Sequence, residues 1–286
     1  MCARISRNPA MMTKTRQNQE DSQSAARLPP RQVVTLLYKP NHRLFEMAFE
    51  ANFDAGPLVQ VWVTLKSMGV KILSTTMSSQ DGNKGTFSGF LDSENYGLTA
   101  RAITSKLEAL GILRNVKITG GEEVVVNQMF FPLMDPFGNR MMLTTQESFQ
   151  KMQRALGAVL GSGEGVVAYH EGLSVGSTYA ASVRSMLKGD ARRFLAELSK
   201  IFMAFGIGVC DFREMNFDRL HFVIELRRSI ECEGEKSQKP RSQWLRGMLI
   251  GAASTILDTP MDCRETKCVA MGHAFCEFEV FKSQGC

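Results

Sequence analysis

Between residues 43 and 119 the spacing of the apolar residues changes in a fixed order, which limits the possible folds more than any other feature of the chain. Alternating apolar residues predict strands, and apolar residues three or four positions apart predict helices. The resulting order is strand, helix, strand, strand, helix, strand, with one more strand expected in front. The strands are expected at 32–39, 44–50, 70–79, 85–92 and 112–119, and the helices at 58–68 and 100–110. This order predicts an antiparallel sheet with both helices on one face.

The same order is that of a ferredoxin-like domain. The segment DAGPLVQVWVTLKSMGVKI (54–72), a turn and an amphipathic helix followed by a glycine and a strand, resembles ACT domains. The resemblance covers residues 43–119 and implies a regulatory domain that senses a small molecule such as an amino acid. The ligand contacts that it implies are Asn52, Asp54 and Gly56. The residues alone allow a second explanation, in which Asp54 and Gly56 only form the turn.

The second half of the chain mixes helical and strand-like spacing. Helices are expected at 149–160, 166–187, 190–206 and from Trp244, and strands at 208–217, 219–228, 260–267 and 275–282. A length of 286 residues favours about two domains. We therefore expect an α+β protein. Its parts are a disordered basic leader (1–31), a ferredoxin-like ACT-type domain (32–121) and a mixed α/β ligand-binding domain (122–286).

The charge of +5 is concentrated at the start of the chain. Residues 1–31 carry six of the 34 basic side chains and two of the 29 acidic ones, so the rest of the chain is nearly neutral. A nearly neutral domain lacks the basic face that binds phosphates, so nucleic acid contact is expected only through the leader or through a partner. No apolar stretch is long enough for a membrane span, and the N-terminus lacks a secretory signal. These features predict a cytoplasmic protein.

Three of the seven cysteines fall close together in the pattern Cys263-x4-Cys268-x7-Cys276. In a reducing compartment, clustered thiols favour a metal site over disulfides. Thiolates that a strand, a turn and a second strand bring together would suit tetrahedral zinc. The alternative is a set of buried, inert cysteines that act as small apolar residues.

The stretch RGMLIGAASTILDTPMDCRETKCVAMGHAFCEFEVF (246–281) resembles the C-terminal half of vinyl-4-reductase-like domains. The shared features are a glycine-punctuated helix, a strand with E-x-x-C, and A-x-G-x-x-x-C-x-F. They stand here as Gly247, Gly251, Glu265, Cys268, Ala270, Gly272, Cys276 and Phe278. The resemblance spans about residues 130–282. It implies a small-molecule-binding module with the α/β fold of trafficking-complex subunits, which enclose an apolar tunnel. Relatives are sensor domains of transcription activators that respond to aromatic compounds, in which clustered cysteines and an acidic residue hold zinc.

One position departs from this family, which often has a cysteine just before the tryptophan that opens the long helix. Here Gln243 precedes Trp244. Cys232, Cys263 and Glu265 are the candidates for the missing ligand. The predicted zinc site therefore comprises Cys263, Cys268, Cys276, Cys232 and Glu265, with the fourth ligand left open.

We also predict an enclosed, mainly apolar pocket between the helices at 166–187, 190–206 and from Trp244. Its candidate ligand contacts are Tyr169, His170, Phe202, Trp244 and Met248. The first of these helices mixes apolar residues with hydroxyls, as a ligand-binding wall often does. Its small residues, including Gly172 and Gly176, have a competing explanation: they would also let neighbouring helices approach closely.

Together these observations predict an intracellular sensor or regulatory protein without catalytic activity, which binds an apolar or aromatic small molecule and forms a homodimer. The alternatives are a reductase of pigment or aromatic metabolism and a dimeric scaffold subunit. The sequence has no dinucleotide-binding fingerprint and no convincing proton donor, and both observations argue against an enzyme.

Overall fold

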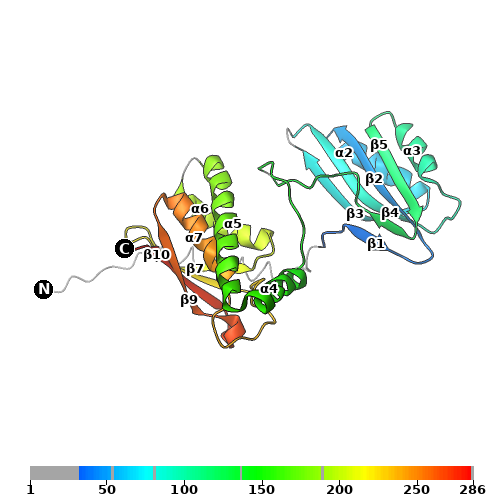
Figure 1. Cartoon of the computed structure of the whole chain (residues 1–286). Helices are drawn as coiled ribbons and strands as arrows, with labels where there is room; N and C mark the ends of the chain where they lie inside the picture. Colours follow the sequence, from blue (N-terminus) through cyan, green and yellow to red (C-terminus); the bar gives the residue numbers. More distant parts are fainter. Residues whose placement is uncertain (1–31, 53–54, 80–81, 136, 188–189, 285–286) are drawn as a thin grey trace. The chain divides into compact units, whose positions relative to one another are not determined.

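The computed structural model describes residues 32–284, apart from 53–54, 80–81, 136 and 188–189 (Figure 1). The chain divides into two compact units, and the boundary falls between Leu133 and Met134. This boundary lies later than residue 122, where the sequence suggested it, because the strand β6 (Val124–Val126) pairs with β1 (Leu36–Tyr38) in the first unit. The predicted leader lies outside the described residues.

The N-terminal unit has the element order that the sequence predicted between residues 43 and 119. Its elements after β1 are β2 (Arg43–Asn52), α2 (Ala55–Ser67), β3 (Val70–Ser79), β4 (Lys84–Ser93), α3 (Ala100–Glu108), β5 (Arg114–Glu122) and β6. The four long strands form an antiparallel sheet in the order β3-β4-β2-β5. Gly69 follows α2 with a φ of 72°, a left-handed conformation that ends the helix at little cost because glycine has no Cβ.

The two faces of this sheet bury different kinds of side chain. Phe45, Met47 and Phe49 of β2 belong to the main core, which includes residues of both helices. The alternate residue Leu44 packs with Val125 of β6 in a smaller cluster. The unit thus matches the split β-α-β arrangement in its element order and sheet order; whether it is related to ACT domains remains a prediction.

The C-terminal unit places helices against one face of a second antiparallel sheet (Figure 1). Its helices are α4 (Gln146–Leu160), α5 (Glu164–Met186), α6 (Ala191–Ala204) and α7 (Gln243–Leu257). Its strands are β7 (Val209–Asn216), β8 (His221–Arg227), β9 (Met261–Lys267) and β10 (Cys276–Lys282), in the order β7-β8-β10-β9. Short 3-10 turns lie at Gly161–Gly163 and Val269–Met271. No described helix is long and apolar enough to cross a membrane.

The helices α5 and α7 touch through their backbones, and glycines make this possible. A Cβ atom on Gly172 would lie 1.9 Å from the carbonyl oxygen of Trp244, and one on Gly176 would lie 2.1 Å from that of Met248. In the other direction, a Cβ on Gly247 would lie 1.9 Å from the carbonyl oxygen of Tyr169. The small residues of α5 therefore serve close helix packing, the second of the two explanations that the sequence allowed.

We predict that Gly176→Ala lowers the free energy of unfolding of the chain by about 2 kcal/mol, because the added methyl group must push two backbones apart. Gly157→Ala is the matched control, since its Cβ would find no atom closer than 3.8 Å. That change should be neutral or should stabilise α4 by up to about 1 kcal/mol. Urea unfolding measures both. Equal effects of the two substitutions would contradict the close contact of α5 and α7.

Candidate metal centre

Four side chains with metal-binding atoms meet beside the N-terminus of α7. Cys232 lies in the turn after β8, Glu265 on β9, Cys268 just after β9, and Cys276 at the start of β10. All four are buried, and their potential ligand atoms all lie within 4.8 Å of one another. We call this set the Cys3Glu group.

The geometry and chemistry of the Cys3Glu group suit a tetrahedral metal ion. The Sγ atoms of Cys232 and Cys268 are 3.7 Å apart. Two thiolates on one tetrahedral zinc ion, each about 2.3 Å from the metal, would be about 3.8 Å apart. Three sulfurs and one carboxylate are also ligand types that zinc accepts. The group could therefore hold such an ion with little rearrangement.

Ser242 links several members of the Cys3Glu group. Its hydroxyl donates to Oε1 of Glu265 at 2.8 Å, and its backbone N–H donates to Oε2 at 3.1 Å. The same hydroxyl lies 3.1 Å from Sγ of Cys232 and 3.8 Å from Sγ of Cys276. Hydrogen bonds of this kind orient metal ligands. The backbone N–H of Val269 donates to Sγ of Cys276 at 3.3 Å in the same way.

A second buried carboxylate, that of Glu231, caps α7. The first N–H groups of a helix have no partner within the helix. Here Oε1 of Glu231 accepts from the N–H of Trp244 at 3.0 Å, and Oε2 accepts from the N–H of Leu245 at 3.1 Å. Ser242 occupies the N-cap position, but its hydroxyl makes no capping bond to the helix and is directed to Glu265 instead. Glu231 thus takes over the capping role.

Burial and mutual contact alter the acidity of these groups. Burial raises the pKa of Glu231 to about 8 and that of Glu265 to about 8, because a charged carboxylate is costly away from water. Hydrogen bonds from Cys232 and Cys276 hold the pKa of the Cys268 thiol well below its usual value. The same contact with Cys268 raises the pKa of Cys232.

Of the five predicted metal ligands, the structure brings together Cys232, Glu265, Cys268 and Cys276. Cys263 is buried on the same face of β9 as Glu265 but lies outside the group. Residues two apart on a strand are separated by about 6.6 Å. Cys263 therefore lies about this distance from Glu265 along β9, on the side away from Cys268. Burial raises the pKa of its thiol above the usual value. Gln243 accepts a hydrogen bond from Arg246.

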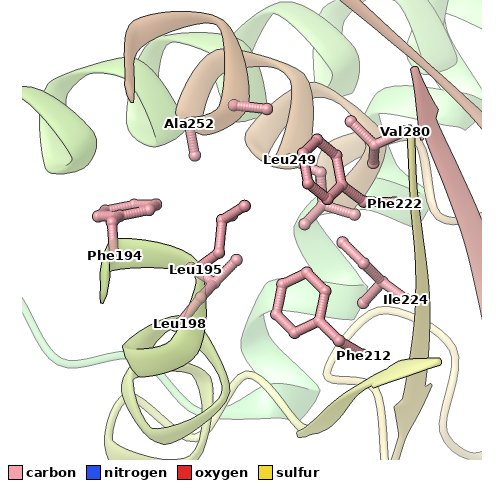
Figure 2. Close-up of a pocket in the computed structure, with 10 residues that line it drawn as sticks. Phe194, Leu195, Leu198, Phe212, Phe222, Ile224, Leu249, Ala252 and Val280 are labelled. Atoms are coloured by element: carbon pink, nitrogen blue, oxygen red, sulfur yellow. The ribbon is translucent and has the colours of Figure 1, made fainter. Parts of the chain in front are cut away.

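An apolar cavity lies between α6, α7 and the sheet, and its lining includes no member of the Cys3Glu group (Figure 2). Phe194, Leu195 and Leu198 of α6 point toward α7 and the sheet. The lining is entirely apolar and comprises Phe194, Leu195, Leu198, Phe212, Phe222, Ile224, Leu249, Ala252, Ala253 and Val280. Its volume is about 10 Å³, about enough for one water molecule. Two of the three predicted walls, α6 and α7, line this cavity, but α5 contributes no lining residue and the sheet takes its place. The cavity is also much smaller than a binding pocket for an organic compound.

None of the predicted ligand contacts lines this cavity. Trp244 packs its ring edge-on against Phe149 of α4, with centroids 5.3 Å apart. Tyr169 lies beside Arg246 and His170, while Phe202 and Met248 are buried in the core. The sequence missed the cavity residues because they have the same apolar character as any core residue.

The predicted regulatory site in the N-terminal unit is described only in part. Asn52 is the last residue of β2 and is exposed, and Gly56 lies exposed in the first turn of α2. Asp54 lies outside the described residues. A ligand at this site therefore stays a prediction.

Comparison with known families identifies the C-terminal part of the chain. A family model of the V4R domain matches residues 222–282, which include every member of the Cys3Glu group. This match agrees with the cysteine and glycine pattern of residues 246–281. The chain therefore carries a vinyl-4-reductase-like (V4R) domain.

Several solved structures are similar to part of the chain. They include the phenol-responsive sensory domain of the transcription activator PoxR with phenol (18% identity, 51% of this chain and 78% of that one, TM-score 0.47). A vinyl-4-reductase family protein from Methanocaldococcus jannaschii has 18% identity over 50% of this chain and 85% of that one, with a TM-score of 0.36. A trafficking protein particle complex subunit 3 from Naegleria fowleri, covalently bound to palmitic acid, has 17% identity over 49% and 95%, with a TM-score of 0.40. No curated protein sequence matches the chain.

The buried Glu231 predicts a pH dependence of stability in the metal-free protein. Its pKa of about 8 in the folded state lies above the ordinary value of 4.5, so the folded state keeps the proton over this interval. The stabilisation is then fully present below about pH 4.5 and is lost as the pH rises to 8, by up to about 1.4 kcal/mol per pH unit. Glu231→Gln should make the decline shallower, as measured by urea unfolding between pH 4.5 and 8.

Glu265 adds a similar decline, so the slope should be reduced rather than abolished in Glu231→Gln. Glu171→Gln is the control, because that side chain is exposed. A wild-type stability that rises over this pH interval would contradict the assignment of a protonated, buried Glu231.

Proposed function

We propose that this chain is a non-catalytic small-molecule sensor or regulatory protein, whose V4R domain binds a compact apolar compound and is held in shape by zinc. The observation that carries the proposal is the position of α7. Its N-terminus meets the Cys3Glu group, and its middle, through Leu249, Ala252 and Ala253, forms one wall of the apolar cavity. A change at the cavity is therefore connected by one rigid helix to the candidate metal centre.

The lining of the cavity favours a ligand without polar groups. No lining side chain can donate or accept a hydrogen bond, so burying a hydroxyl there would cost about 1–3 kcal/mol. The side of α7 that faces α5 is closed by backbone contact at Gly247 and Gly251. Room for a ligand would therefore come from a displacement of the other walls, which are α6 and the sheet. A compound that stabilises the displaced form would shift the population of the two arrangements.

A thermal-shift experiment tests the ligand. We expect toluene or cyclohexane at ten times its dissociation constant to stabilise the chain by about 1.4 kcal/mol, and phenol to do so less. Ala252→Val narrows the cavity and should weaken the effect. Ala181→Val, at an exposed position of α5, is the matched control. Absence of stabilisation by every apolar compound would contradict the sensor and favour a scaffold; substrate-dependent oxidation of a nicotinamide cofactor would favour the reductase.

Zinc is the metal that the Cys3Glu group fits best, with Cys232, Glu265, Cys268 and Cys276 as its ligands. Bound zinc would supply a cross-link between the turn after β8 and the strands β9 and β10, and its binding energy would contribute to folding. The positive end of the α7 dipole lies at the same place, which favours the negative charge that three thiolates and a carboxylate carry.

We predict about one zinc per chain in protein purified without a chelator, measured by elemental analysis. Substitution of Cys232, Cys268 or Cys276 by Ser should weaken zinc binding at least about tenfold. Cys263→Ser is the matched control: its thiol is buried too but lies outside the group, so it should keep the metal. Wild-type protein without metal, or loss of zinc in Cys263→Ser alone, would contradict this ligand set.

A further inference from the structure

Cys232 differs from the other three members of the Cys3Glu group in the kind of element that carries it. Glu265 and Cys276 lie on strands of the sheet, and Cys268 directly follows β9. Cys232 lies in the turn formed by residues 229–235, which is closed by its own hydrogen bonds. The N–H groups of Cys232 and Glu233 donate to the carbonyl oxygen of Ser229 at 3.2 and 2.9 Å, and the N–H of Glu235 donates to that of Cys232 at 3.1 Å. The position of the Cys232 sulfur therefore depends on what holds this turn.

The helix α4 holds the turn from outside. The side-chain amide of Gln150 donates to the carbonyl oxygens of Ile230 at 3.1 Å and Glu233 at 3.0 Å. One amide group thus joins the two residues that lie on opposite sides of Cys232 along the chain. Gln146 also donates to the carbonyl oxygen of Glu233, at 3.3 Å, and Arg154 forms an ion pair with Glu235.

These contacts are a large part of what attaches α4 to its unit. Gln153 is its one buried residue, and much of the rest of the helix is exposed. A further contact of α4 also lies near the metal centre, since Phe149 packs against Trp244, whose N–H donates to Glu231. The attachment of α4 and the position of Cys232 therefore depend on the same turn.

We infer that α4 belongs to the metal centre, with Gln150 as the positioning residue that holds Cys232 within reach of the other three ligands. This inference rests on the proposed zinc site. It has a reciprocal consequence: if the docked α4 favours zinc binding, bound zinc must favour the docking of α4 by the same factor. The segment that joins the two units leads into α4, the first helix of the V4R-containing unit. A change in the docking of α4 would therefore alter the structure at the start of that unit.

The experiment uses the full chain and zinc itself. Gln150→Glu keeps the size of the side chain but replaces the donor by an acceptor that faces two carbonyl oxygens. We expect its zinc affinity, measured by competition with a chromophoric chelator, to fall about tenfold. Gln150→Lys restores a donor and should recover most of the affinity. Lys151→Ala is the matched control on the exposed side of α4, where Lys151 pairs with Glu147 of the same helix.

Hydrogen exchange over residues 146–160, with zinc and after its removal, gives the second readout and needs no variant. We expect exchange in α4 to become about tenfold faster without zinc. This is the same factor by which the docked α4 is expected to strengthen zinc binding. A chain that binds one zinc, with unchanged affinity in Gln150→Glu or unchanged exchange in α4, would overturn this inference and leave the zinc site standing. A wild-type chain that binds no zinc would overturn both. Should Gln150→Glu fail to fold, the exchange experiment on the wild-type chain decides.

Discussion

The N-terminus of α7 is held by two buried carboxylates, and both the Cys3Glu group and the apolar cavity depend on where this helix lies. Glu231 binds the N–H groups of Trp244 and Leu245, and Glu265 binds the N–H and hydroxyl of Ser242. Neither carboxylate forms an ion pair among the described residues, which is unusual for buried acids. Burial raises the pKa of both groups to about 8, so each keeps its proton near neutral pH, and the N–H groups at the start of the helix supply hydrogen-bond partners in place of a cation.

The face of α7 that packs against α5 is fixed by a different constraint, the lack of a side chain at two glycines. Gly247 and Gly251 let α7 touch the backbone of α5, so the two helices have no space between them. The apolar cavity lies on the other side of α7, between α7, α6 and the sheet.

The sequence predicts much of the fold because periodicity depends on local geometry. The alternation in β9 and β10 places Glu265 and Cys276 on the buried face, and the spacing to Cys268 brings that thiol to the same end of the strands. The choice between Cys232 and Cys263 could not be made from spacing. It depends on a turn from a distant part of the chain that lies close to β9 in the fold. A local sequence pattern does not predict such a contact.

Three further features could not be predicted from the sequence, for physical reasons. Glu231 and Gln150 act through backbone atoms of other segments, so their roles leave no pattern in residue types. The small residues of α5 were compatible with both a ligand-binding wall and close packing, and only the distance between the two backbones separates these explanations. The same holds for the cavity, because the residues that line it are ordinary core residues.

The central claim is that Cys232, Glu265, Cys268 and Cys276 together form one metal site. X-ray absorption spectroscopy at the zinc edge, on the full chain as purified, tests it most directly. The account predicts three sulfur ligands at about 2.3 Å and one oxygen ligand at about 2.0–2.2 Å. A first shell with nitrogen ligands, or with fewer than three sulfurs, would contradict it.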